Sequence, residues 1–558
     1  MKNLKRKGIC LVIAGVVLAT SFSGCGNSDN AKDSAGSTSS PSSTATSTVA
    51  EKPDPFGKYE TTVKLTTGRE LKDAIKLLPN GDTSENNELT RYILEKLNIE
   101  VTNDWEAPEG DAYDQKVNLA IASNDLPDML TVSKYNVFKN AVQSGLVYDI
   151  SSVYENYASP LLKSIYEAED GKALNSAKVD GKLMGLVTPS ITADAYKLLW
   201  VRKDWMDKLS LSEPKTFDDI INIATAFRDK DPDGNTKNDT VGLAVTKEHD
   251  SFDAIYGSYG SYPKEWLRDS NGKLFYGSTS AETKAALAKI NELYSKNIID
   301  KEFALRKDPM ELISSNKAGI YYGYWWSPWY PLNNSVKNDP KAEWRPYLAP
   351  LTSEGKFNNH MQAPAIRYLM ISKDCKNPEA VMKIVNLMNR LERRQDPMYG
   401  KFYDSNPEIN NDIKPFFPIY FNVDFADAVA RKSVAYKDAF EGRTKVEDLD
   451  AEGQLNLKHY KTETETPKKD LAAYSAYTAY YYGAVPTMDK RVNKVEGLFY
   501  GQTKTMETKW ASLSKLEDEA FLKIIMGEEP IDYFDTFVKQ WNEMGGEIIT
   551  KEVEEMIK

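Results

Sequence analysis

The sequence predicts an α/β fold built from two large lobes or domains, and three observations support that prediction. The chain has 558 residues, which exceeds the size at which a single hydrophobic core stops growing. Its hydrophobic content of 41% and charged content of 27% are ordinary for a globular protein. Strand-like and helix-like patterns alternate after Lys52, and this order favours mostly parallel strands that are covered by helices.

The first part of the body contains two rounds of this alternation. TTVKLTT at 61–67 places Val63 and Leu65 on one face of a strand, and ELTRYILEKLNI at 88–99 repeats apolar residues at helical spacing. A strand at 99–103, a helix at 113–123, a strand at 126–132 and a helix at 136–145 follow. Ligands of such sheets bind at the carboxyl ends of the strands. We therefore expect a binding edge near 67–70 and near Ser133.

The same signals continue downstream. Thr216 is the expected N-cap of an amphipathic helix, and Gly527 is the expected end of another helix. Strand signals lie at 181–189, 196–202, 273–276 and 317–323, and further helix signals lie at 203–211, 217–230, 281–295, 377–389, 515–526 and 530–546.

The first 24 residues read as a signal peptide. A basic n-region precedes an apolar stretch and a small-residue processing site that ends at Cys25. A signal that ends in Gly-Cys resembles a bacterial lipobox, which predicts lipidation of Cys25; an ordinary cleaved signal or an uncleaved anchor is the alternative. Residues 25–54 are dominated by small and polar side chains and read as a flexible linker.

Charge and cysteine content restrict the class of partner. Without residues 1–24, which carry four positive charges and no negative ones, the formal net charge falls from −11 to −15. Such an acidic chain is not expected to bind nucleic acid or an anionic membrane surface. Cys375 is the one cysteine left after Cys10 in the signal and Cys25, so no disulfide within one mature chain is expected.

A calcium site is predicted at 231–239, where the sequence is DPDGNTKND. Asp231, Asp233, Asn235 and Asp239 stand at alternating positions, and Lys237 can offer its backbone carbonyl. This spacing matches the first nine positions of an EF-hand loop. The match is incomplete, because the sixth position is Thr and the twelfth is Gly242. The alternative is a surface turn that binds no metal.

The run GIYYGYWWSPWYPL at 319–332 contains seven aromatic rings among fourteen residues. A sugar presents an apolar C–H face, which an indole ring can cover, and hydroxyl groups that need a few hydrogen-bonding partners. Because strand residues alternate sides, about half of these rings are expected to point into the core. The candidate stacking residues are Trp325, Trp326, Tyr324, Trp200 and Trp266, and the candidate polar partners are Glu248, Arg202 and Arg367.

A family resemblance is carried by segments that share an order rather than by one diagnostic motif. The segments are the lipobox with its linker, ELTRYILEKLNI, NDLPDML, LWVRKDWMDKL, DPDGNTKNDTVGL, NGKLFYGS, KAGIYYGYWW, ISKDCKNPEAVMKIVNLMN and KLEDEAFLKIIMGEEPIDYFDTFVKQW. Together they resemble the extracellular solute-binding lipoproteins of ATP-binding-cassette (ABC) importers, family 1. The long Gram-positive branch, similar to the alginate-oligosaccharide-binding proteins, fits best.

This resemblance implies a two-lobed type II periplasmic-binding-protein fold, with additional C-terminal helices. The implied lobes are 55–190 with about 360–430, and 191–359 with about 431–558. The resemblance also implies a monomer on the outer face of the cell membrane, held there by lipid, that binds an oligosaccharide and delivers it to permease subunits. Structural Ca²⁺ is the one expected cofactor, and no enzymatic activity is expected.

Two other functions remain open from the sequence. A secreted glycoside hydrolase or lyase would share the aromatic rings, and the catalytic carboxylate pair of a hydrolase cannot be recognised among 82 acidic residues. However, the chain contains no Gly-x-Ser-x-Gly, His-Glu-x-x-His or phosphate-loop motif, and its three histidines are scattered. A surface lectin or glycan sensor is the second alternative. The sequence does not identify the sugar.

Overall fold

A computed structural model describes residues 53–79, 81–237, 239–306, 308–406, 409 and 413–557, without the side chains of Glu169 and His249. The residues from Pro53 onward form one compact unit. The predicted signal peptide, the lipidated Cys25 and the linker up to residue 52 lie outside the described residues.

A five-stranded sheet organises the first half of the body, in the order β2-β1-β3-β13-β6. Strands β2, β1 and β3 are parallel, whereas β13 is antiparallel to both of its neighbours, β3 and β6. This sheet confirms the predicted α/β class. The strand bounds are β1 Val63–Leu71, β2 Ile99–Pro108, β3 Met129–Val132, β6 Leu186–Pro189 and β13 Ala365–Ile371.

Helices pack around this sheet and bury their apolar stripes in one hydrophobic cluster, here called the first core, which draws on residues 63–187 and 365–423. In α1 the buried residues are Leu89, Ile93 and Leu97, which is the helical spacing that the sequence predicts. The helices are α1 Glu88–Leu97, α2 Asp111–Ala122, α3 Tyr135–Gln143, α4 Ser151–Tyr157, α5 Pro160–Glu167, α6 Lys172–Asn175, α13 Pro378–Glu392 and α14 Met398–Ser405. Strands β4 (Lys178–Val179) and β5 (Lys182–Leu183) form a small hairpin.

The second sheet has the order β10-β7-β11, with β7 at Leu198–Arg202, β10 at Ile320–Gly323 and β11 at Trp344–Tyr347. Both strand pairs are antiparallel, so the expectation of a mostly parallel second sheet is wrong for these strands. The reason is that β7 enters the sheet directly from the connection with the first core, at the edge where β10 ends. Parallel bridges from residues 241–244 extend this sheet beyond β10.

Helices cover this sheet to form the second core, which draws on residues 196–357 and 474–553. The predicted N-cap Thr216 accepts a hydrogen bond from the Asp219 N–H, and Gly527 ends its helix with φ of 75°. The helices are α7 Lys203–Lys208, α8 Phe217–Asp229, α9 Asp253–Ser258, α10 Ala281–Ser295, α11 Met310–Ser314, α12 Leu332–Asn338, α18 Lys504–Met526, α19 Tyr533–Trp541 and α20 Glu547–Met556. Two short strand pairs are β8 Trp266–Arg268 with β9 Leu274–Tyr276, and β12 Phe357–His360 with β14 Val492–Val495.

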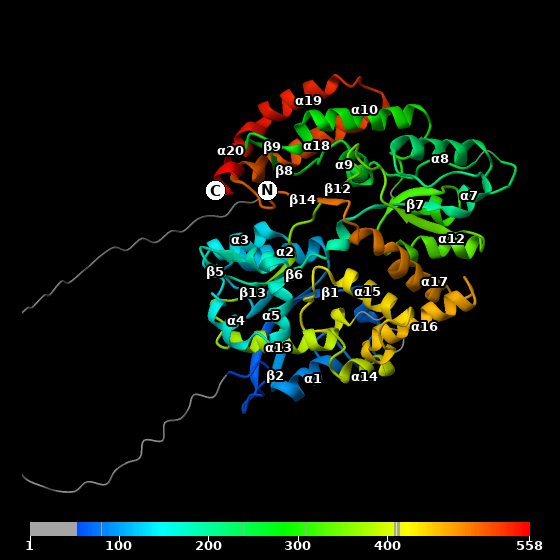
Figure 1. Cartoon of the computed structure of the whole chain (residues 1–558). Helices are drawn as coiled ribbons and strands as arrows, with labels where there is room; N and C mark the ends of the chain where they lie inside the picture. Colours follow the sequence, from blue (N-terminus) through cyan, green and yellow to red (C-terminus); the bar gives the residue numbers. More distant parts are fainter. Residues whose placement is uncertain are drawn as a thin grey trace, which may run out of the picture. The chain divides into compact units, whose positions relative to one another are not determined.

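A third group of helices, which the sequence analysis did not separate, has a smaller cluster of its own. Figure 1 shows α15 (Ala428–Phe440), α16 (Ala451–Glu465) and α17 (Leu471–Tyr477) grouped together. A π-helical turn at Thr478–Gly483 continues α17. These elements share a hydrophobic cluster with Trp325 of the aromatic run, so they support the end of β10.

Within the described residues, the chain passes between the first and second cores three times. The passages are 187–196, 357–365 and 423–474, and the third contains α15 and α16. No helix in the described part of the chain has the length and apolar character needed to span a membrane. The predicted lobe boundaries stay a prediction.

Candidate functional site

One edge of the second sheet gathers aromatic and charged side chains. Leu198, the first residue of β7, lies opposite Gly323, the last residue of β10, so Lys197 and Tyr324 extend from the same edge. The Lys197 ammonium lies 5.5 Å from the centre of the Tyr324 ring. It also forms an ion pair of 2.6 Å with the Asp250 carboxylate. This edge holds the carboxyl end of β10 and the amino end of β7, because the two strands are antiparallel.

Two rings of the aromatic run form a stacked platform at this edge. Tyr324 and Trp326 are 5.0 Å apart at an interplanar angle of 15°, and both side chains are half-buried. Trp325 lies between them in sequence but points the other way: it is buried, its Nε1 donates to Asp194 Oδ1 at 2.8 Å, and its ring packs against Tyr480. The Tyr324/Trp326 ring pair is therefore accessible, while Trp325 supports it from the core side.

Asp194, Lys197, Asp250 and Asp253 act electrostatically on Tyr324, and Glu265 and His360 interact with members of this group. We call these six residues the charged cluster. Burial raises the pKa of Asp253 to about 8, although the nearby Lys197 opposes this shift. Burial raises the pKa of Glu265 to about 7 and lowers the pKa of His360. Each side chain opposes the effect of burial on the other: His360 lowers the pKa of Glu265, and Glu265 raises the pKa of His360. The cluster thus contains carboxyl groups that can carry a proton near neutral pH and donate it in a hydrogen bond.

Four predicted ligand contacts are core residues, which corrects the sequence-based expectation: Trp325, whose indole is bonded to Asp194, and also Trp200, Arg202 and Trp266. Trp200 and Arg202 have no exposed surface, and Trp266 is 2% exposed. The Trp200 Nε1 donates to the Tyr324 carbonyl at 3.0 Å. The Arg202 guanidinium is bonded to the carboxylates of Asp204 and Asp339. Trp266 packs against Tyr276 and Trp541. Trp200 and Arg202 stand on the central strand β7, which is covered on both faces and offers a ligand no surface.

The other predicted contacts lie at two separate places. Glu248 is exposed and precedes Asp250 of the charged cluster. Ser133 is exposed at the end of β3, and Arg367 is near the start of β13, which pairs with β3 in the antiparallel direction. Ser133 and Arg367 therefore share one edge of the first sheet. The Arg367 guanidinium forms an ion pair of 2.6 Å with Glu70, which lies near the end of β1.

Sequence reasoning missed most of the charged cluster. Only Lys197 had a usable signal, because it immediately precedes the apolar segment LLWVR that forms β7. Asp250, Glu265 and His360 come from loops or strand ends that are distant in sequence, and no local pattern marks them. The tyrosine-rich segment that ends in the π-helical turn was a readable signal, since Tyr474, Tyr477 and Tyr481 recur at helical spacing.

The predicted calcium loop gathers its carboxylates around one amide. Asn235 Nδ2 donates to Asp233 Oδ2 at 2.7 Å and to Asp239 Oδ1 at 3.1 Å, and the Asn235 N–H donates to Asp231 Oδ1 at 3.0 Å. Lys317 forms an ion pair of 2.6 Å with Asp239. Among the described residues, no group of three or more His, Cys, Asp or Glu side chains has the arrangement needed to hold a metal ion.

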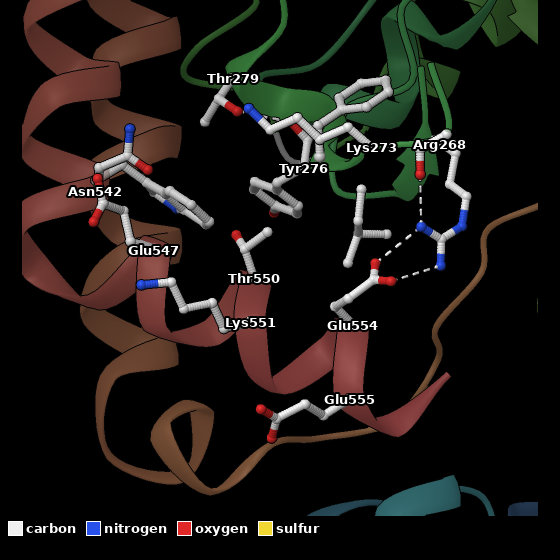
Figure 2. Close-up of a pocket in the computed structure, with 14 residues that line it drawn as sticks. Arg268, Lys273, Tyr276, Thr279, Asn542, Glu547, Thr550, Lys551, Glu554 and Glu555 are labelled. Atoms are coloured by element: carbon white, nitrogen blue, oxygen red, sulfur yellow. Dashed lines mark hydrogen bonds and ion pairs between the residues drawn. The ribbon is translucent and has the colours of Figure 1, made fainter. Parts of the chain in front are cut away.

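Two cavities differ in their relation to the site. A small cavity of about 60 Å³ is lined by residues such as Thr192, Gln362 and Tyr500, and by Ala195 and Met361, which are sequence neighbours of Asp194 and His360, but by no member of the charged cluster itself. A larger cavity of about 730 Å³ lies elsewhere, between the β8–β9 hairpin and the C-terminal helix α20. Figure 2 shows this larger cavity, in which Arg268 pairs with Glu554 across the opening. None of the predicted ligand residues lines it.

Comparison with known proteins identifies the class of protein. A family described as bacterial extracellular solute-binding protein matches residues 80–391, which is more than half of the chain, so the protein belongs to this family. It is similar to the polygalacturonan/rhamnogalacturonan-binding protein YtcQ of Bacillus subtilis (strain 168), with 26% identity over 482 residues that cover 83% of this chain and 87% of the relative.

Two solved structures share the fold. The alginate-binding protein AlgQ2, determined without calcium ion, aligns with a TM-score of 0.56 and 16% identity over 89% of this chain and 98% of that chain. The Streptococcus pneumoniae ABC-transporter substrate-binding protein FusA, as an EF-hand mutant in complex with fructo-nystose, aligns with a TM-score of 0.56 and 17% identity over 89% and 99%. At these identities the likeness concerns the fold, and it confirms the α/β solute-binding architecture.

Proposed function

We propose that this protein is the extracellular binding component of an ABC importer and that it binds an oligosaccharide at the Tyr324/Trp326 ring pair. The observation that supports this most directly is the half-exposed stacked pair at a strand end, beside hydrogen-bonding groups of the charged cluster. Stacked rings offer an apolar face to a sugar, while carboxylates and Lys197 can bond its hydroxyl groups. The family membership supplies the extracellular role, and the names of YtcQ and FusA suggest the saccharide and the ABC importer.

Binding is expected to proceed without making or breaking a bond. The saccharide stacks on the ring pair, and Glu248 and Asp250 accept hydrogen bonds from its hydroxyls. Ser133 and Arg367 on the first sheet are the proposed contacts of the opposite lobe, which closes over the ligand through the three chain passages. Permease subunits then receive the ligand from a monomer whose lipid, on Cys25, holds it at the outer face of the membrane.

We also propose a structural Ca²⁺ ion in the loop at 231–239. Its oxygen-rich donor set suits a hard cation: the side chains of Asp231, Asp233, Asn235 and Asp239, with the carbonyl of Lys237, would hold it. The three carboxylates already converge on Asn235. The Asn235 amide would have to turn its oxygen inward, since its NH₂ group faces two carboxylates. A bound cation would supply the positive charge that this NH₂ group now only partly provides.

The test is isothermal titration of residues 53–558, the compact unit, with neutral and acidic oligosaccharides, followed by analysis of the sugars for cleavage. We expect saturable binding with the sugar intact. Trp326→Ala should weaken binding by about 10- to 100-fold, because the apolar area of the ring is lost. Trp329→Ala is the matched control: it lies in the same run, is 37% exposed, and is outside the ring pair. Equal affinity losses in both variants, or cleavage of the sugar, would refute the proposal.

A further inference from the structure

We infer that this site selects uncharged oligosaccharides over oligosaccharides of uronic acids, an inference that rests on the proposed function. The basis is that basic side chains around the site are already in ion pairs with carboxylates of the protein. Lys197 beside the ring pair, and Arg367 and Lys72 at the edge of the first sheet that holds Ser133, are each already paired with a carboxylate. The charged cluster also holds Asp194 and Glu265, for which no ion pair with Lys or Arg is present among the described residues.

Lys197 lies over one ring of the pair, with its ammonium 5.5 Å from the centre of the Tyr324 ring. Its ammonium contacts both the Asp250 carboxylate, at 2.6 Å, and the Asp250 carbonyl, at 2.8 Å. The Lys197 side chain is 11% exposed, whereas the Asp250 side chain is 50% exposed. A ligand that approaches this pair therefore meets the acceptor oxygens of Asp250 rather than the ammonium. Sugar hydroxyls can donate to these oxygens, but a ligand carboxylate would be repelled.

The edge of the first sheet repeats this arrangement. Arg367 forms an ion pair of 2.6 Å with Glu70, and Lys72 forms an ion pair of 3.0 Å with the other oxygen of the same carboxylate. Lys72 also pairs with Glu109. The Arg367 side chain is 14% exposed and that of Lys72 is 17% exposed. A uronate would have to displace Glu70 to reach either cation, and the displaced carboxylate would be left buried without a partner.

The remaining acids leave a surplus of carboxyl groups. Asp194 accepts from the neutral Trp325 indole at 2.8 Å. Glu265 is half-exposed and interacts with His360; burial raises the pKa of Glu265 to about 7, so this group is partly ionised at pH 7, and burial lowers the pKa of His360. A carboxylate whose neighbours are acids and neutral groups favours ligands that donate hydrogen bonds. The relative YtcQ is named for binding polygalacturonan, which is an acidic polymer, so this inference separates the two proteins.

The experiment compares matched saccharides that differ only at C6, which is a primary alcohol in one and a carboxylate in the other. Residues 53–558 are titrated with neutral gluco-, galacto- and manno-oligosaccharides of three to four sugars, and with the same oligosaccharides oxidised to uronates at C6. We expect at least one neutral oligosaccharide to bind, and its oxidised counterpart to bind about tenfold or more weakly at low ionic strength. Salt should narrow this difference, because it screens the repulsion.

Variants assign the effect to the carboxyl groups. Glu265→Gln and, independently, Asp250→Asn should reduce the ratio of neutral to uronate affinity, whereas Glu282→Gln on the exposed face of α10 should leave it unchanged. A uronate that binds as tightly as its neutral counterpart, or more tightly, would overturn the inference while the proposed function stands. If no saccharide of either kind binds, the proposed function itself fails. A ratio that stays unchanged in both cluster variants, with folding confirmed by circular dichroism, would also overturn the inference.

Discussion

The alternation of three consecutive residues decides which rings at the end of β10 can meet a ligand. Tyr324 and Trp326 stack on the accessible side, and Trp325 is buried with its indole bonded to Asp194. The sequence predicted an aromatic platform at a strand end, but it could not tell which rings face outward. That choice depends on Asp194 and Tyr480, which come from remote segments.

Replacing Trp325 by Phe should therefore affect stability first. The ring still packs, but Asp194 loses its hydrogen bond in a half-buried position, which should cost about 1–3 kcal/mol of the free energy of unfolding. The pKa of Asp194, which burial raises and the indole N–H lowers, should rise further. Urea unfolding measures the loss. Trp329→Phe, at a 37% exposed position, is the control; the same loss in both variants would contradict the role of the hydrogen bond.

Arg202 shows how a residue-level prediction fails. A basic residue at the end of a strand is a reasonable ligand contact from sequence alone. Its true partners include Asp339, which is 137 residues away, and Asn316, which follows α11. Because three segments meet around the guanidinium, Arg202 is a buried structural residue. Only the tertiary structure shows these contacts.

At the level of elements, helices were predictable and sheets less so. The helices α1, α8 and α18 follow from apolar spacing and from the capping residues Asn87, Thr216 and Gly527, which are local signals. The antiparallel pairing of β7 with β10 and β11 was not predictable, because the direction of β7 depends on how the chain leaves the first core. The helices α15–α17 were not proposed from the sequence, although the tyrosine spacing at 474–481 is a readable local signal for α17. Their shared packing with Trp325 is visible only in the tertiary structure.

The π-helical turn depends on Gly483. A Cβ atom at this position would lie 2.3 Å from the Trp325 carbonyl oxygen, which belongs to the backbone and cannot rotate away. We expect Gly483→Ala to lower the free energy of unfolding by about 2–3 kcal/mol. Gly400→Ala, in the exposed part of α14 with no atom within 4 Å of the new Cβ, should instead raise it by about 0.5–1 kcal/mol. Chemical unfolding compares the two; a stable Gly483→Ala protein would contradict this packing.

Glu517 in α18 makes the stability depend on pH. Its buried carboxyl group accepts from the Tyr276 and Ser278 hydroxyls, and burial raises its pKa from 4.5 to about 7. The folded protein thus binds a proton that the unfolded chain releases between these values, so the contribution of this group to stability is lost as the pH rises through 7. As the pH rises from 4 to 8, the free energy of unfolding of the Glu517→Gln variant should increase relative to that of the unmodified protein, by up to about 3 kcal/mol. Thermal unfolding at several pH values tests this, with exposed Glu519→Gln as the control.

The loop at 231–239 offers a test of the proposed calcium ion. Asp231→Ala should lower the melting temperature in calcium-containing buffer, because the ion would stabilise the folded state by mass action. In a chelating buffer the variant and the unmodified protein should differ little. Glu282→Ala, on an exposed helix face, controls for loss of surface charge. Equal losses with and without chelator would show that the loop stabilises the protein through its own hydrogen bonds, such as those of Asn235.

For the whole molecule, composition and segment order predicted the α/β class and the solute-binding family, and both are confirmed. The charged cluster could not be predicted, because its members are brought together by the passages between the cores: Asp194 lies in one passage and His360 in another. The division of the chain into lobes at particular residues stays a prediction.

The three passages also determine how the molecule responds to a cut in its backbone. A protease that cleaves only the passage at 187–196 would still leave two covalent links between the halves that contain the first and second cores. The nicked protein should elute from a sizing column as one species and separate into two fragments only on a denaturing gel. Cleavage at this passage could therefore escape detection under native conditions. The two fragments would not correspond to the two halves, because residues 365–423 of the first core would stay on the C-terminal fragment with the second core.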